Sequence, residues 1–164
     1  MTNQLPQSPS PTDPRPEGFQ VTVQAQYVKD LSFESPNAPQ IFAAMSAPPS
    51  IQMTVNVQTR STGGDKYEVV LVLKIEAKIE SKTAFIAELA YGGVFSVPAM
   101  PEDQLKIFLL VEGPRILFPF ARSALSNAIR DGGFPYVIIQ PVDFMALFLA
   151  NRNNVGTMPA AGAA

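Results

Sequence analysis

The carboxylates are the side chains of this sequence whose type and spacing come nearest to a catalytic site. The chain has no histidine and no cysteine, so the commonest general base, the commonest transition-metal ligand and the thiol nucleophile are absent. Acidic pairs that could serve a glycosidase or an aspartic enzyme occur at Asp30/Glu34, Glu76/Glu80 and Glu102-Asp103. Two of them lie beside lysine or at the start of a loop, as solvated ion pairs and caps do. We therefore predict no enzyme activity, no metal site and no cofactor, and keep a small acid-based enzyme or ligand-binding protein as the alternative.

Two glycine pairs, Gly92-Gly93 and Gly132-Gly133, are the remaining candidates for a ligand-binding loop. Neither precedes a Lys-Ser/Thr pair or opens the strand-glycine-helix unit that binds nucleotide phosphates. We interpret the first pair as the end of a strand and the second as the end of a helix.

The composition indicates more apolar surface than one small core can hide. Hydrophobic residues make up 46% of the 164 residues and charged residues only 16%, against roughly 25% charged in typical soluble domains. A chain of this length builds one core. The excess predicts subunit contacts or a surface that holds other polypeptides.

Charge and hydropathy exclude two classes of partner. The net charge is -2 and no basic block occurs, so the chain lacks the cationic patch that nucleic acid requires. Purely apolar runs such as Ile107–Val111 are far shorter than the roughly 20 residues of a membrane-spanning helix. Residues 1–18 have neither the basic nor the apolar region of an export signal. We expect a cytoplasmic protein without integral membrane insertion.

Four segments alternate between apolar and polar residues, which predicts half-buried strands. The first places Phe19, Val21, Val23, Ala25 and Tyr27 on one face. The others run over Ile51–Gln58, Tyr67–Ile79 and Thr83–Tyr91. Short connections after the second and third segments predict antiparallel hairpins. The connection Leu31–Ser50 holds four prolines and is predicted to be a long crossover loop.

Helical spacing replaces alternation in the last third of the chain. It predicts a long helix over Pro114–Arg130 with one wide apolar face, and shorter helices over Glu102–Val111 and from Asp143 to about Arg152. Asp143 is placed to cap the last helix, with Val142 and Leu147 as a hydrophobic staple. The predicted fold is α+β: a four-stranded antiparallel sheet with a long crossover loop after strand one and helices packed on one face. The domain spans residues 19–154, and the Pro- or Ala-rich ends at 1–18 and 155–164 are predicted to be disordered tails.

Several segments are specific enough to suggest a family. Tyr27–Pro39 reads YVKDLSFESPNAP and Ile116–Arg122 reads ILFPFAR. Shorter matches accompany them at Tyr67–Leu71, Thr83–Glu88, Gly92–Ser96, Gly133–Pro135 and Pro141–Phe148. Together, in this order over roughly residues 19–152, they resemble the SecB family of bacterial protein-export chaperones.

The resemblance implies a function without catalysis. Proteins of this family hold unfolded precursors in an export-competent state without ATP and deliver them to the translocation ATPase SecA. The resemblance also implies a homotetramer, a dimer of dimers in which first strands pair and long helices are sandwiched. The implied interface residues are Val21, Val23, Ile116, Leu117, Leu125 and Ile129. A SecB-like chaperone dedicated to one partner, such as an antitoxin, stays open as an alternative.

Two binding surfaces follow from the same resemblance. Its aromatic client cleft corresponds to Phe85, Phe120 and Phe148, and our interpretation of the groove wall adds Phe42, Ile51 and Met53. Its SecA-binding surface corresponds to Asp30, Glu34, Ile86 and Glu88. The chain departs from the family pattern in having no tryptophan at the groove and a less acidic net charge than expected.

Overall fold

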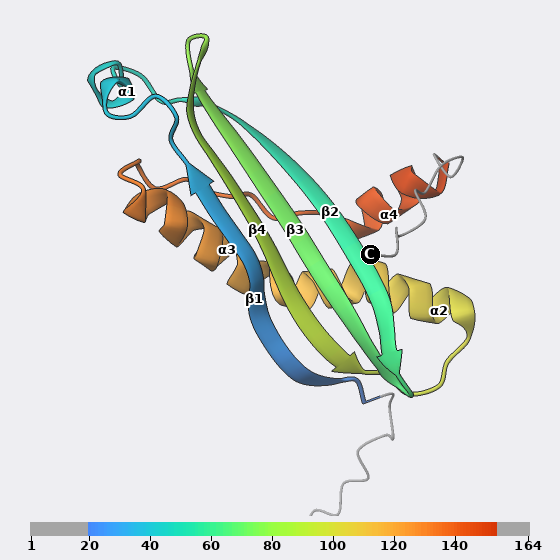
Figure 1. Cartoon of the computed structure of the whole chain (residues 1–164). Coiled ribbons are helices and arrows are strands. Elements are labelled where there is room, and N and C mark those ends of the chain that lie inside the picture. Colours follow the sequence, from blue (N-terminus) through green and yellow to red (C-terminus); the bar gives the residue numbers. More distant parts are fainter. Residues whose placement is uncertain (1–19, 154–164) are drawn as a thin grey trace, which may run out of the picture.

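A computed structural model of the protein describes residues 20–153, so the tails predicted at 1–18 and 155–164 lie outside the described residues, as does Phe19. The chain forms one four-stranded sheet and a set of helices (Figure 1). In chain order the elements are β1 (Thr22–Glu34), α1 (Gln40–Ala43), β2 (Ser50–Gly63), β3 (Lys66–Ile79), β4 (Lys82–Ser96), α2 (Glu102–Ile107), the π-helical turn η1 (Phe108–Glu112), α3 (Gly113–Asp131) and α4 (Phe144–Asn153). The predicted α+β class is confirmed.

The sheet is antiparallel throughout and has the strand order β1-β4-β3-β2. Tight turns join β2 to β3 and β3 to β4, as the short connections predicted, and β1 crosses back to pair with β4. The backbone of the first turn has positive φ at Gly63 (114°) and Gly64 (60°), a region in which side chains with a Cβ are disfavoured. Because β4 and β3 lie between them in the strand order, β1 and β2 are the two edges of the sheet.

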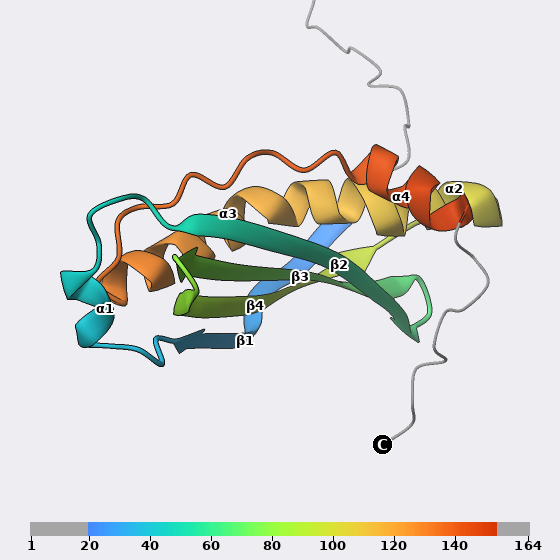
Figure 2. The same cartoon turned by 90° about the horizontal axis from the view of Figure 1, so that it is seen from above.

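The helices α2, α3 and α4 lie on one face of the sheet, and the other face is open (Figure 2). We call these the covered face and the open face. The crossover between β1 and β2 carries the short helix α1 at one end of the sheet, where Ile41 is buried in the core. At the start of α4, Asp143 Oδ1 accepts a hydrogen bond of 2.9 Å from the Ala146 amide. The predicted N-cap is confirmed.

Strand β1 is longer than predicted and changes face within its length. Register shifts between Val23 and Ala25, and again between Val28 and Asp30, mark two bulges. Val23 pairs with the buried Phe95 on the covered face, whereas Tyr27 pairs with Gly92 on the open face. The prediction that Val23, Ala25 and Tyr27 share one face is therefore wrong, because each extra residue reverses the alternation.

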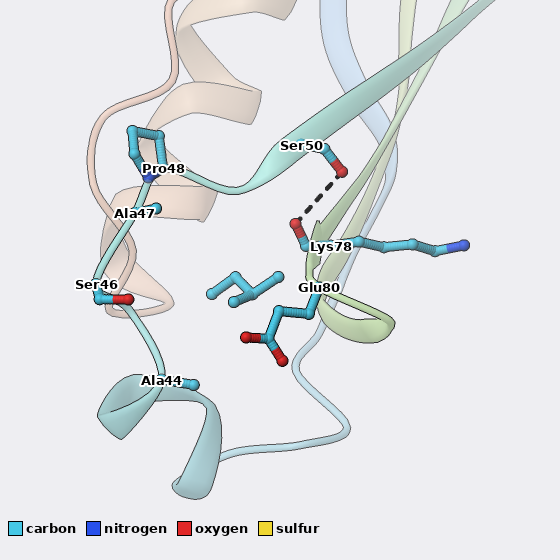
Figure 3. Close-up of a pocket in the computed structure, with 8 residues that line it drawn as sticks. Ala44, Ser46, Ala47, Pro48, Ser50, Lys78 and Glu80 are labelled. Carbon is cyan, nitrogen blue, oxygen red and sulfur yellow. Dashed lines mark hydrogen bonds between the residues drawn. The ribbon is translucent and has the colours of Figure 1, made fainter.

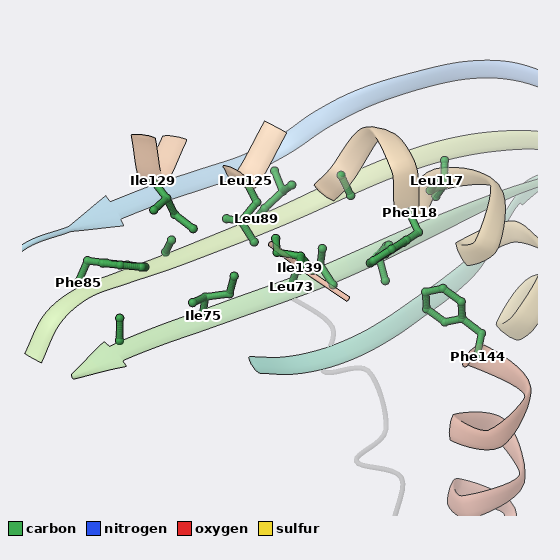
Figure 4. Packing of buried hydrophobic residues seen from close by; sticks show 14 of the residues in the cluster. Leu73, Ile75, Phe85, Leu89, Leu117, Phe118, Leu125, Ile129, Ile139 and Phe144 are labelled. Atoms are coloured by element: carbon green, nitrogen blue, oxygen red, sulfur yellow. The ribbon is translucent and has the colours of Figure 1, made fainter. Parts of the chain in front are cut away.

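The wide apolar face of α3 divides into two stripes. Leu117, Ala121, Leu125 and Ile129, spaced four residues apart, have no exposed surface and pack on the sheet of the same chain. Figure 4 shows Leu117, Leu125 and Ile129 above Leu73, Ile75 and Leu89. We correct the assignment of Leu117, Leu125 and Ile129 to a subunit interface, because their side chains are fully covered within one chain. Ile116 and Phe120 form the other stripe and stay 37% and 53% exposed.

Candidate functional site

Four phenylalanine rings form a cluster at the α1 end of the covered face. Phe85 of β4 lies 5.7 Å from Phe33 of β1 and 4.8 Å from Phe134, measured between ring centroids. Phe134 in turn lies 5.1 Å from Phe42 of α1. Phe85 has no exposed surface, and Phe42 is 39% exposed. Phe85 is thus closed off by other rings in this structure, which corrects the expectation that it lines an open cleft.

Phe33 and Phe134 belong to this cluster and were missed by the sequence analysis. The chain turns after α3 at Gly132 and Gly133, and a Cβ at Gly132 would lie 2.2 Å from the Phe33 ring. The absence of a side chain at Gly132 therefore leaves room for the Phe33 ring. Phe134, two residues later, packs against Phe85. Two signals in the sequence could have indicated these residues. One is the Gly-Gly-Phe-Pro sequence after the long helix, and the other is the apolar side chains two residues apart at Leu31 and Phe33, a spacing that indicates a strand.

Two hollows and two exposed apolar side chains lie along strand β2. A hollow of about 350 Å³ lies between the crossover and the ends of β2 and β3 (Figure 3). Ile51 and Met53 come next along β2 and are 42% and 37% exposed. A smaller hollow of about 70 Å³ follows, lined by Val55, Asn56, Val57, Leu110, Leu147, Phe148 and Asn151. The structure thus places Ile51, Met53 and Phe148 in one line beside an edge strand, which we call the β2 track.

Phe120 lies apart from the β2 track. Its ring stacks on Tyr91 of β4 at 6.5 Å between centroids, next to strand β1, which pairs with β4 through Val28. Around it, apolar side chains of β1 and α3 are exposed: Val23, Val28, Leu31 and Ile116. We call this set, with Phe120, the α3–β1 surface. Phe120 is thus placed with Ile116 and Val23, and not with the other residues predicted for client binding.

The four residues predicted to bind SecA lie together on the open face. Strand register pairs Glu34 with Ile86 and Ser32 with Glu88, and Asp30 follows in the next row beside Ala90. Glu34 and Asp30 are exposed, and Ile86 and Glu88 are half-buried. An apolar side chain therefore sits among carboxylates on a sheet face that no described helix covers (Figure 2).

A buried carboxylate, Glu68, organises the other end of the open face. It is 4% exposed and accepts hydrogen bonds from the Tyr27 hydroxyl, from Lys29 Nζ at 2.9 Å and from Arg60. Burial alone would raise the pKa of Glu68, but these three donors outweigh it and lower the pKa to about 2. Burial, with the Glu68 carboxylate beside it, raises the pKa of Tyr27 to about 12. Glu68 therefore stays ionised and Tyr27 stays neutral across the physiological pH range.

One acid of each of two of the pairs that suggested catalysis, Glu76 and Glu102, forms an ion pair with a lysine at the surface. Glu76 bonds Lys78 at 3.2 Å and Glu102 bonds Lys106 at 3.0 Å. Over residues 20–153 no three His, Cys, Asp or Glu side chains gather as metal ligands would. Within the same stretch, every helix is too short or too polar to cross a bilayer. No geometry in the described chain favours the enzyme alternative.

The fold and these surfaces define a class of α+β protein in which helices cover one sheet face and uncovered apolar side chains collect along the sheet edges. Comparison of the sequence with known protein families assigns the family. The model of the family described as "Preprotein translocase subunit SecB" matches residues 14–155, and the chain belongs to the SecB family.

Named relatives agree with this assignment. The chain is 49% identical to a protein-export protein SecB of Granulibacter bethesdensis over 82% of this chain and 84% of the relative. It is 46% identical to a protein-export protein SecB of Bradyrhizobium sp. over 80% and 82%. A Mycobacterium tuberculosis SecB-like chaperone, solved with a ChAD peptide from the HigA1 antitoxin, matches with a TM-score of 0.63 at 9% identity, covering 74% of this chain and 90% of that one. At that identity the likeness concerns the fold alone.

Proposed function

We propose that the protein is a chaperone that acts in the cytoplasm, holds unfolded precursor polypeptides without ATP and delivers them to SecA. The observation that carries the client part is the β2 track, where Ile51 and Met53 stay exposed beside an edge strand. Relatives at 46–49% identity named as export proteins support the export role. The alternative of a chaperone dedicated to an antitoxin has only a 9% identical structure behind it.

The β2 track suits an extended client. The free edge of β2 offers backbone hydrogen bonds to any unfolded segment, independent of its sequence. Client side chains on one side of that segment would meet Ile51, Met53 and the hollow beside Phe148. Burial of each apolar client side chain contributes on the order of 1.5 to 3 kcal/mol, so several weak contacts add to a firm complex. A folded protein hides such side chains and is not bound.

Phe42 has a second role in this proposal. It is the exposed member of the phenylalanine cluster, and it shields Phe134 and, behind that ring, Phe85. A client aromatic ring that replaces the ring of Phe42 would stack on Phe134. Phe85 then acts as the floor of the cleft instead of a direct contact.

Complex formation with a precursor tests the client proposal. We expect the purified protein to bind a chemically unfolded precursor and to ignore the same protein when folded. Ile51→Gln should weaken binding clearly, while Ile107→Gln should not, because Ile107 has similar exposure (37%) but lies on α2. Equal binding of folded and unfolded precursor, or equal effects of the two substitutions, would contradict the proposal.

The open face is proposed to dock SecA through Asp30, Glu34, Ile86 and Glu88. Charge reversal by Glu34→Lys together with Glu88→Lys should weaken SecA binding and leave client binding unchanged. Glu102→Lys together with Asp103→Lys, two exposed acids on α2, is the control for the same change in net charge. Unaltered SecA binding in the double variant would remove the docking surface and spare the client proposal.

A homotetramer is proposed through the α3–β1 surface. The free edge of β1, near Val21 and Val23, can pair with the same edge of a second copy, and the exposed stripe of Ile116 and Phe120 can meet another helix. Light scattering should give four times the chain mass for the wild type and a smaller assembly for Phe120→Glu. A monomeric wild type would contradict this part.

A further inference from the structure

Ile86, at the centre of the proposed docking surface, has a carboxylate on each side. On β1 its register partner is Glu34, and on β3 it is Glu76. Opposite partners in antiparallel strands point to the same face. Glu76 therefore lies on the open face with Ile86, although nothing in the sequence pattern linked Glu76 to the docking residues.

Two lysines lie beside these acids, both on β3. Lys78 bonds Glu76 at 3.2 Å and is 46% exposed, against 32% for Glu76. Lys74 pairs in register with Glu88 and is exposed. Lys29, next to Asp30 in the chain, is instead held by the buried Glu68. The β1 side of Ile86 therefore carries uncompensated acid, and the β3 side carries acid partly neutralised by lysine.

We propose that Glu76 is a further SecA-binding residue and that Lys78 restrains it. The partner surface that fits has an apolar side chain over Ile86 and a cation on each side of it, one for Glu34 and one for Glu76. Because those two residues lie on strands separated only by β4, the two cations lie about 10 Å apart. To bind, the partner's second cation displaces Lys78 from Glu76. The proposal rests on the proposed docking of SecA to the open face.

Charge complementarity is the reason for choosing this occupant. A second copy of the chain would place Glu34 and Glu76 against like charges, which disfavours the contact. The proposed subunit contacts at β1 and α3 leave the open face uncovered. Unfolded clients are selected by exposed apolar surface, whereas Ile86, Val72 and Val94 on this face are half-buried.

Binding of purified SecA to charge-neutral variants tests the proposal. Glu76→Gln should weaken binding about two- to fivefold, as Glu34→Gln does, and Lys78→Gln should strengthen it by a similar factor. The SecA affinity of the combined Glu76→Gln/Lys78→Gln variant should be close to that of Glu76→Gln alone, since Lys78 acts through Glu76. Client binding should be unchanged in all of them.

The exposed ion pair of Glu102 with Lys106 on α2 provides matched controls. Glu102→Gln and Lys106→Gln change the net charge identically and should leave SecA binding unchanged. If Glu34→Gln weakens binding while Glu76→Gln and Lys78→Gln do nothing, the role of Glu76 is refuted and the docking surface stands. If Glu34→Gln and Glu88→Gln also do nothing, the docking proposal itself fails, and the role of Glu76 with it.

Discussion

Leu89 and Glu88 are neighbours on β4 and lie on opposite faces of the sheet. Leu89 is fully buried under α3, and Glu88 stands half-buried on the open face between Ser32 and Lys74. The covered face is stabilised by apolar packing. The open face carries charged and hydrogen-bonded side chains, among them the buried carboxylate of Glu68. In the proposed function, client binding and SecA binding use opposite faces of this one sheet.

The largest difference between the faces should appear in stability. Leu89→Ala removes buried methyl groups and leaves a cavity, so it should lower the free energy of unfolding by about 3 kcal/mol. Glu88→Ala should change it by no more than about 0.5 kcal/mol. Urea unfolding at equal protein concentration measures both. Comparable losses would contradict the assignment of the two faces.

Glu68 is the exception on the open face, and its removal should cost about 2 kcal/mol. Glu68→Gln removes the negative charge that forms ion pairs with Lys29 and Arg60. The folded pKa of Glu68, about 2, lies below the ordinary 4.5. Its stabilisation is therefore fully present above pH 4.5 and lost as the pH falls toward 2.

Unfolding of both forms from pH 7 to pH 2 measures this loss. The difference between wild type and Glu68→Gln should shrink below pH 4.5, while Glu102→Gln should stay close to wild type throughout. A difference that does not change with pH would show that the carboxylate charge is not what stabilises the cluster.

Tyr27→Phe should have a smaller effect, about 1 kcal/mol, because it removes one hydrogen bond and keeps the ring over Gly92. The folded pKa of Tyr27, about 12, lies above the ordinary 10. Its contribution is present below pH 10 and lost as the pH rises to 12. The variant should lack this alkaline loss, whereas Tyr136→Phe, at an exposed position, should retain it.

The smallest expected effect is that of salt on the wild type. Raising the salt concentration screens exposed charges, so SecA binding should weaken several-fold while client binding stays level or strengthens. Titration calorimetry at low and high salt measures both affinities. Parallel weakening of the two would argue that clients are also held by charge.

The sequence predicted β3 and the long helix well because each keeps one period over many residues. Strands β2 and β4 continue past their predicted ends at Gln58 and Tyr91 to Gly63 and Ser96, so the interpretation of Gly92-Gly93 as the end of a strand is wrong. Strand β1 was predicted less well, since bulges after Val23 and Val28 reverse its alternation. They moved Tyr27 to the open face and hid the continuation of the strand through Glu34.

The site was predicted in part. The strand register places Asp30, Glu34, Ile86 and Glu88 together on the open face, and their binding of SecA stays a prediction. Helical spacing could not divide the apolar face of α3 between the chain's own sheet and free surface, so Leu117, Leu125 and Ile129 were misassigned. Closure of Phe85 by Phe33 and Phe134 depends on tertiary contacts that no local pattern contains.

The most direct test of separate tasks is a cross-comparison of two double variants. Ile51→Gln/Met53→Gln alters the β2 track, and Glu34→Gln/Glu88→Gln alters the open face. Binding of each to an unfolded precursor and to SecA is measured under one set of conditions. The account predicts that the first variant binds the precursor more weakly and keeps its SecA affinity, and that the second does the reverse. Weakening of both affinities in either variant would contradict it.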